Sequence, residues 1–95
     1  MIVRIVRMAF ATGKENAFRT IFETHYETIL AMKGCSHLEL LQDVEDPDVL
    51  ITYSHWESLQ DLETYRQTDF FTAVWTKTKV LFREKAVAFS MRPVV

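Results

Sequence analysis

The chain has only two glycines, Gly13 and Gly34, among its 95 residues. Loops that cradle nucleotide phosphates are built from closely spaced glycines, because only a residue without a side chain lets the backbone come so near a phosphate group. The sequence contains no such loop. This absence argues against a bound nucleotide, including a tightly held flavin.

Cysteine and metal-ligand clusters are also scarce. Cys35 is the only cysteine, which rules out an internal disulfide and fits a reducing compartment. It follows Gly34 at a predicted strand start with no adjacent basic residue, so we interpret it as a small buried filler. His25, His37 and His55 fall on three different predicted elements, and none belongs to a closed ligand set. We therefore expect no metal.

Long apolar runs and clusters of basic residues are missing as well. The net charge is −2, from 11 basic and 13 acidic residues, and the basic ones are spread along the chain. This leaves no electrostatic footprint for nucleic acid or an anionic membrane. The first ten residues, MIVRIVRMAF, are too few and too charged for a signal peptide or a membrane span. We expect a cytoplasmic protein that binds neither nucleic acid nor membrane.

The sequence is rich instead in apolar and aromatic residues, which make up 48% and 13% of it, with seven phenylalanines. Its length predicts a single domain over residues 1–95, with a modest core that hides about 60–65% of the unfolded chain's surface. The aromatic excess suits a thick core, a buried interface or a pocket for a flat ligand. Core packing is the simplest of the three.

Hydrophobic periodicity predicts four strands, at 1–10, 35–43, 49–57 and 86–92. It predicts helices over 58–66 and 69–83, with Ser58 and Thr68 as their caps, and one that starts from a capping box of Thr12 and Glu15 and runs to Met32. A polar loop at 44–48 suits a hairpin connection between the second and third strands. The resulting β-α-β-β-α-β order is the ferredoxin-like arrangement, an α+β fold with a four-stranded antiparallel sheet and its helices on one face.

The opposite face of this sheet is predicted to be apolar too. Alternate residues of the first and third strands form it: Val3, Ile5, Ala9, Val49, Ile51 and Tyr53. A bare face of this kind is rarely left to water in a monomer. We therefore expect a homodimer in which two copies pack sheet against sheet about a two-fold axis. His37 and His55, on neighbouring strands, would face that interface.

The inner side of the sheet is the predicted place for a ligand. Aromatic residues from several elements could line one space there, although core packing is the simpler interpretation; they are Trp56, Trp75, Phe22, Phe71 and Tyr65. His25 lies on the apolar stripe of the first helix, where a core role is more usual than a functional one. Arg4 and Arg7 are charges within a central strand. Each either pairs with an acid such as Glu39, the simpler interpretation, or reaches an anionic ligand.

Several segments resemble the antibiotic biosynthesis monooxygenase (ABM) domain family. They are Gly34-Cys35 opening the second strand, the acidic proline loop Asp43–Asp48, the turn Trp56-Glu57-Ser58, and Leu62–Phe71 (LETYRQTDFF). The resemblance covers nearly the whole chain and implies a dimeric α/β barrel, in which two sheets pack face to face. It also implies oxidation of phenols, quinols or polyketide aromatic rings by molecular oxygen without metal or flavin. The deprotonated substrate is then its own electron source.

The sequence departs from the family pattern at two positions. Tyr65 and Phe70 stand where many members carry histidines, and the features of the haem-degrading branch are absent. The resemblance then leaves Tyr65, if its phenol pKa is lowered, or His25 to handle a proton. Trp56 and Trp75 would stack the substrate ring, and Phe22, Phe71 and Arg4 would contact it.

Three functions remain open on this basis. The first is a cofactor-independent monooxygenase acting on a small aromatic, quinol or polyketide-like substrate. The second is a non-catalytic dimeric module of the same fold that binds a ligand or assists another protein, which the missing histidines favour. The third is an enzyme of proton-transfer chemistry, such as lactone isomerisation, which no residue specifically supports.

Overall fold

Four strands form one antiparallel sheet in the order β2-β3-β1-β4 in the computed structural model, which describes residues 1–95. The strands are β1 (Ile2–Ala9), β2 (Cys35–Gln42), β3 (Val49–Trp56) and β4 (Val87–Met91). The two central strands pair from Ile2↔Trp56 to Ala9↔Val49. This sheet confirms the predicted ferredoxin-like α+β fold.

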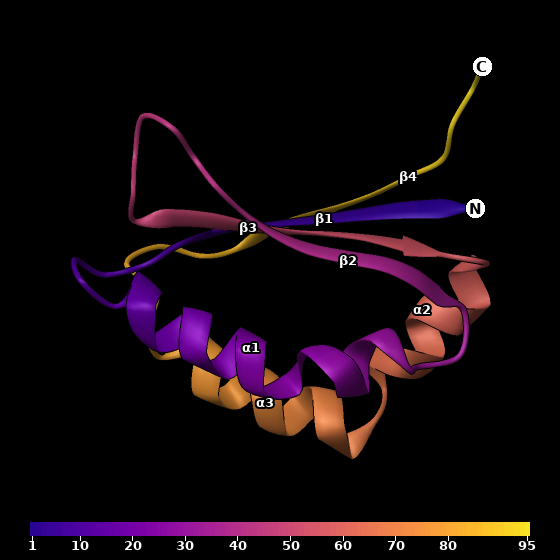
Figure 1. Ribbon diagram of the computed structural model, residues 1–95, viewed down its shortest axis with the longest axis horizontal. Helices are drawn as coiled ribbons and strands as arrows, with labels where there is room; N and C mark the ends of the chain where they lie inside the picture. Colours follow the sequence, from indigo (N-terminus) through magenta and orange to yellow (C-terminus); the bar gives the residue numbers. More distant parts are fainter.

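Three helices cover one face of the sheet: α1 (Glu15–Leu30), α2 (Leu59–Arg66) and α3 (Asp69–Lys79). Figure 1 shows all of them on the same side, with α1 and α3 next to one another and α2 at one end. Helix α1 packs on β2 and α2 on β3, whereas α3 packs mainly on the other two helices. No helix combines the length and the apolar character needed to cross a membrane.

The main core lies between α1 and the sheet. Its seven buried residues come from the predicted apolar stripe of α1 and from the inward faces of the strands; they are Met8, Phe10, Phe18, Phe22, Ile29, Leu38 and Leu50. A smaller cluster of Ile2, Trp56 and Leu62 lies beneath α2. The alternation predicted for β1 and β3 therefore places the intended residues against the helices.

Two helix caps form as predicted and one does not. The Oγ of Ser58 accepts from the backbone N–H of Asp61 at 3.1 Å, and Thr68 caps α3 through the N–H of Phe71 at 3.0 Å. The capping box at Thr12 is wrong, because α1 begins after Lys14, which has no side-chain cap. A backbone turn, in which the Lys14 N–H donates to the Ala11 carbonyl at 2.8 Å, leaves Thr12 outside the helix.

Helix α3 also ends earlier than predicted. It stops at Lys79 rather than residue 83, and the chain turns back toward the sheet. There Phe82 bridges to Phe10, and the Ala11 N–H donates to the Leu81 carbonyl at 2.9 Å. The apolar residues after Lys79 thus extend the sheet region, although their spacing also suits a helix.

A β-bulge at the start of β2 moves Cys35 to the other face. Cys35 lies opposite Trp56 while His37 lies opposite His55, so two β2 residues face one β3 residue. Strict alternation along residues 35–43 predicts that Cys35 shares a face with His37, and this expectation is wrong because one extra residue inverts the alternation. Cys35 packs beside Trp56 and Leu62, and burial raises the pKa of its thiol. Both observations fit a filler.

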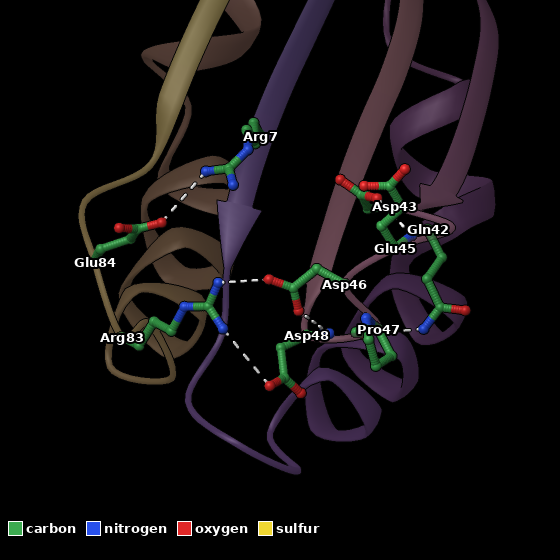
Figure 2. A network of polar contacts seen from close by, with 9 residues as sticks. All are labelled: Arg7, Gln42, Asp43, Glu45, Asp46, Pro47, Asp48, Arg83 and Glu84. Atoms are coloured by element: carbon green, nitrogen blue, oxygen red, sulfur yellow. Dashed lines mark hydrogen bonds and ion pairs between the residues drawn. The ribbon is translucent and has the colours of Figure 1, made fainter.

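The predicted hairpin loop between β2 and β3 is tied to the segment before β4. Figure 2 shows the guanidinium of Arg83 reaching both Asp46, at 2.8 Å, and Asp48, at 3.6 Å. The hydrogen bond from Arg83 is the main reason that the pKa of Asp46 lies below its ordinary value. These contacts join two connections far apart in the sequence at the end of the sheet where β1 ends.

Candidate functional site

A cavity of about 250 Å³ lies between the sheet and the helices. Fifteen of its 21 lining residues are hydrophobic, so its walls are mainly apolar. All seven residues that the sequence analysis assigned to the substrate site line it: Arg4, Phe22, His25, Trp56, Tyr65, Phe71 and Trp75. The fold thus brings β1, β3 and all three helices to one space, as an inner ligand site requires.

The floor of the cavity follows the pairing of the central strands. Arg4 lies opposite Ser54, and Val6 lies opposite Thr52, because every second residue of each strand points toward the helices. Met8, further along β1, continues the floor. The floor is therefore polar near the beginning of β1 and apolar toward its end.

An aromatic wall rises from this floor to α3. The Trp56 indole N–H donates to the Ser54 Oγ at 3.0 Å, and the Tyr65 ring stacks on the indole at 5.0 Å between centroids. Phe71 meets Tyr65 edge-on at 5.2 Å and is nearly parallel to Trp75 at 6.1 Å. Trp56 is only 1% exposed. It therefore serves mainly as a fixed wall, while the half-buried Trp75 presents more of its ring to the cavity.

Tyr65 does not meet the condition set for it as a base. Burial, followed by the nearby Cys35, raises the pKa of its phenol to about 12, whereas proton abstraction near neutral pH needs a lowered pKa. The raised pKa therefore disfavours Tyr65 as the base. Its hydroxyl stays protonated over the physiological range and can donate a hydrogen bond to a ligand.

His25 is the remaining proton-handling candidate. It projects from α1 into the cavity lining, is half-buried, and meets Phe70 edge-on with ring centroids 5.3 Å apart. Neutral imidazole has one nitrogen that can accept a proton and another that can donate one. Among the cavity residues, it alone has a side chain suited to act as a base near neutral pH.

Arg4 has no carboxylate within ion-pair distance, although the charge of Glu63 acts on it from further away. Its Nη1 donates to the neutral Ser90 Oγ at 2.8 Å, and Glu39, the acid suggested in the sequence analysis, instead contacts His37 on the opposite face. Burial is the main cause that lowers the pKa of Arg4, with the positive charge of Arg66 next. Arg7 is different, because it pairs with Glu84 at 3.4 Å outside the cavity.

The opposite face of the sheet is open and apolar. Val3, Ile5, Ile51 and Tyr53 occupy it as predicted, whereas Ala9 and Val49, which were also expected there, are buried. Strand β4 adds Val87, Phe89 and Met91, which are 44%, 51% and 45% exposed. His37 and His55 also lie there, with ring centroids 5.0 Å apart. No group of three or more histidines, cysteines or carboxylates is placed to hold a metal ion.

Comparisons with known proteins agree with this geometry. The sequence pattern of the family described as "Antibiotic biosynthesis monooxygenase" matches residues 1–76. A "putative antibiotic biosynthesis monooxygenase" from Nitrosomonas europaea superimposes with a TM-score of 0.90 at 19% identity, covering 100% of both chains. A conserved protein from Methanosarcina mazei Go1 gives 0.89 at 18% identity, covering 97% of this chain and 92% of its own. The search of curated proteins found no match. At these identities the structures show the shared fold.

Proposed function

We propose, since this chain belongs to the antibiotic biosynthesis monooxygenase family, that it is a cofactor-independent monooxygenase for a compact aromatic, quinol or polyketide-like substrate. The observation that carries the proposal is the aromatic cavity of about 250 Å³ with a single imidazole in its wall. Its volume lies just below the range of about 300–1,000 Å³ that is common for small-molecule sites, so a compact ligand fits best.

The proposed chemistry begins with proton removal by His25. In an anthrone-type substrate, an acidic CH₂ carbon of the ring loses a proton to the imidazole, and the resulting anion transfers electrons to molecular oxygen. A carbon–oxygen bond forms at that ring carbon. One oxygen atom remains as a carbonyl, and the other leaves as water with the two hydrogens that the carbon carried. The substrate is oxidised and oxygen is reduced, so atoms and electrons balance.

The other cavity residues would position the substrate and keep water away. Trp75 and Phe71 lie nearly parallel, with planes inclined by 10°, and offer flat surfaces to a ring. The Tyr65 hydroxyl, which stays protonated, would donate a hydrogen bond to the substrate oxygen. Apolar walls exclude water that would otherwise quench the anion. The protein then contributes orientation and a proton acceptor.

The proposal includes a homodimer formed through the open sheet face. Val87, Phe89 and Met91 on β4 lie beside β1 residues of the same face, which joins them into one apolar surface. A continuous apolar surface of this kind on a soluble domain usually marks an interface. A cytoplasmic location is also proposed, because the single free thiol of Cys35 suits a reducing compartment.

A non-catalytic ligand-binding module is the alternative. The raised pKa of Tyr65 favours it, since only His25 is left to move a proton. Phe70 stands where the family often has a second histidine and packs against His25 instead of assisting it. In this alternative the cavity and the dimer stay the same, and the ligand is bound without turnover.

Oxygen uptake by metal-free protein separates the two functions. A panel of hydroquinones and anthrone-type compounds should include one that is oxidised above the background rate. His25→Gln should lower kcat by roughly 10²–10⁴-fold, the usual contribution of a general base. Thr24→Ala changes a neighbouring exposed residue of α1 and should leave kcat unaltered. Binding of a panel member without oxygen uptake would favour the non-catalytic module.

A further inference from the structure

Two guanidinium groups lie at one end of the inner cavity. Arg4 comes from β1 and Arg66 from the last turn of α2, and both belong to the cavity lining. Arg66 is paired, since its Nη1 lies 3.0 Å from one carboxylate oxygen of Glu63 and 3.3 Å from the other. Arg4 is bonded only to the neutral hydroxyl of Ser90. This end of the cavity therefore carries more positive than negative charge.

Arg4 is unusual among the arginines of the sheet region. Arg7 on the same strand pairs with Glu84, and Arg83 reaches both Asp46 and Asp48. Charged groups that leave water are normally paired, because a partly buried charge without a partner loses hydration and gains no attraction in return. The half-buried guanidinium of Arg4 has lost hydration without gaining an ion pair, and only the more distant charge of Glu63 partly offsets this loss.

The positive end adjoins polar floor residues and faces an apolar remainder. Arg4 lies opposite Ser54 on β3 and Ser90 on β4, so a serine flanks it on each of the two neighbouring strands. Two residues further along β1, Val6 lies between Thr52 and Ala88, and Met8 follows. The cavity is thus amphipathic along β1, with a charged end and an aromatic body.

We infer that the ligand of this cavity is an aromatic carboxylate, whose acid group binds to Arg4 with help from Arg66 while its ring lies between the aromatic walls. A guanidinium presents a planar pair of N–H donors that matches the two oxygens of a carboxylate. The inference specifies the substrate class of the proposed function and rests on the same cavity. It does not depend on whether the bound ligand is oxidised.

Calorimetric titration with a matched pair of probes tests the inference. 2-Naphthoate and 2-naphthamide have the same ring system and nearly the same shape, but only the first is charged at neutral pH. Wild-type protein should bind naphthoate roughly ten- to a hundredfold more tightly, the usual gain from hydrogen bonds to a charged group. Arg4→Gln should abolish that preference, and Arg66→Gln should reduce it.

Two further variants keep the test specific. Arg19→Gln removes an exposed arginine that does not line this cavity and should leave the preference intact. Ser90→Ala removes the only hydrogen-bond partner of the Arg4 side chain and should preserve or strengthen the preference. Thermal unfolding and near-ultraviolet circular dichroism establish that each variant is folded. If Arg4→Gln is misfolded, Arg4→Lys, which keeps the charge but loses the planar fork, should weaken naphthoate binding while retaining some preference.

The inference is overturned by equal affinities for the two probes, by an unchanged preference in folded Arg4→Gln, or by binding of neither probe. Failure of the proposed oxidation has a different signature. In that case naphthoate binds preferentially, but no compound of the panel is oxidised above the background rate. Conversely, oxygen uptake without preferential binding of naphthoate would support the proposed oxidation and contradict the inferred binding of a carboxylate by Arg4.

Discussion

The phenol ring of Tyr65 stacks on the indole of Trp56, with ring centroids 5.0 Å apart and planes inclined by 23°. The indole is in turn held by the Ser54 hydroxyl at 3.0 Å. Since both rings are largely buried, the stack closes one side of the cavity and removes the Tyr65 hydroxyl from bulk water. The same burial of Tyr65 therefore gives the cavity an aromatic wall and raises the pKa of the Tyr65 phenol.

Replacing Tyr65 by phenylalanine separates the ring from the hydroxyl. Tyr65→Phe keeps the stack and removes one donor, so oxygen consumption should fall by no more than about tenfold, the value of one ordinary hydrogen bond. Steady-state kinetics with any substrate found in the panel measures this. A loss beyond a hundredfold in a folded variant would restore Tyr65 as the base and contradict the assignment to His25.

The stability of the protein should fall between about pH 10 and 12 because of Tyr65. Its phenol has an ordinary pKa of 10.0 and a folded-state pKa of about 12. As the pH rises, the unfolded chain therefore loses the Tyr65 proton before the folded protein does. The stabilisation of the folded state by protonated Tyr65 is complete below pH 10 and is lost as the pH rises through the folded-state pKa. Two pKa units correspond to roughly 2–3 kcal/mol. Urea unfolding at several pH values should show this loss in the wild type, whereas Tyr65→Phe should show a smaller one.

An aspartate on the open sheet face should dissociate the proposed dimer. Phe89 lies on β4 opposite Ile5 and is 51% exposed. Phe89→Asp would bury a charge in each copy of a sheet-to-sheet interface, which strongly disfavours association. Sedimentation equilibrium at micromolar concentration should give a dimer for the wild type and a monomer for the variant. Val80→Asp, at a site 75% exposed beyond the end of α3, is the control and should remain dimeric. A wild-type protein that sediments as a monomer would contradict the proposed dimer.

Alanine should be more costly at Gly34 than at Gly13. Both glycines have positive φ, +86° and +81°, which costs an alanine about 1–2 kcal/mol. A Cβ at Gly13 meets nothing within 4 Å, but one at Gly34 would lie 2.6 Å from the Cβ of Asp61. Gly34→Ala should therefore lose about 1–3 kcal/mol more than Gly13→Ala, the usual cost of overpacking. Denaturant unfolding of the two variants gives the difference, and equal losses would contradict the close approach of Asp61.

Removing Arg83 should raise the pKa of Asp46. The hydrogen bond from Arg83 is the main cause that lowers this pKa, followed by the backbone N–H of Asp48. In Arg83→Gln the carboxyl should titrate closer to its ordinary value, which carbon-detected NMR across the acid range measures. The lowered pKa favours the folded state above the unfolded-state pKa, and that benefit is lost as the pH falls through the folded value. Arg92→Gln serves as the control, and an unmoved Asp46 in Arg83→Gln would show that the ion pair does not persist in solution.

Much of the fold could be predicted because its signals are local. The alternation in 1–10 and 49–57 separates residues that face the helices from those on the open face. The apolar stripe of α1 and the caps at Ser58 and Thr68 likewise depend on neighbours within a few positions. The errors have both local and distant causes. Thr12 is displaced by a backbone turn, α3 ends where Phe82 meets Phe10, and a bulge reverses Cys35.

The amino-acid sequence by itself determined the order of elements, the two faces of the sheet and the set of aromatic residues around one space. Only the tertiary structure decided the chemistry of that space. Arg4 meets a hydroxyl 86 positions away rather than an acid, and the Tyr65 phenol is desolvated by residues of other elements. The physical reason is that hydrophobic periodicity depends on residues close together in the sequence. Charge pairing and desolvation depend on groups that come together only when the chain has folded.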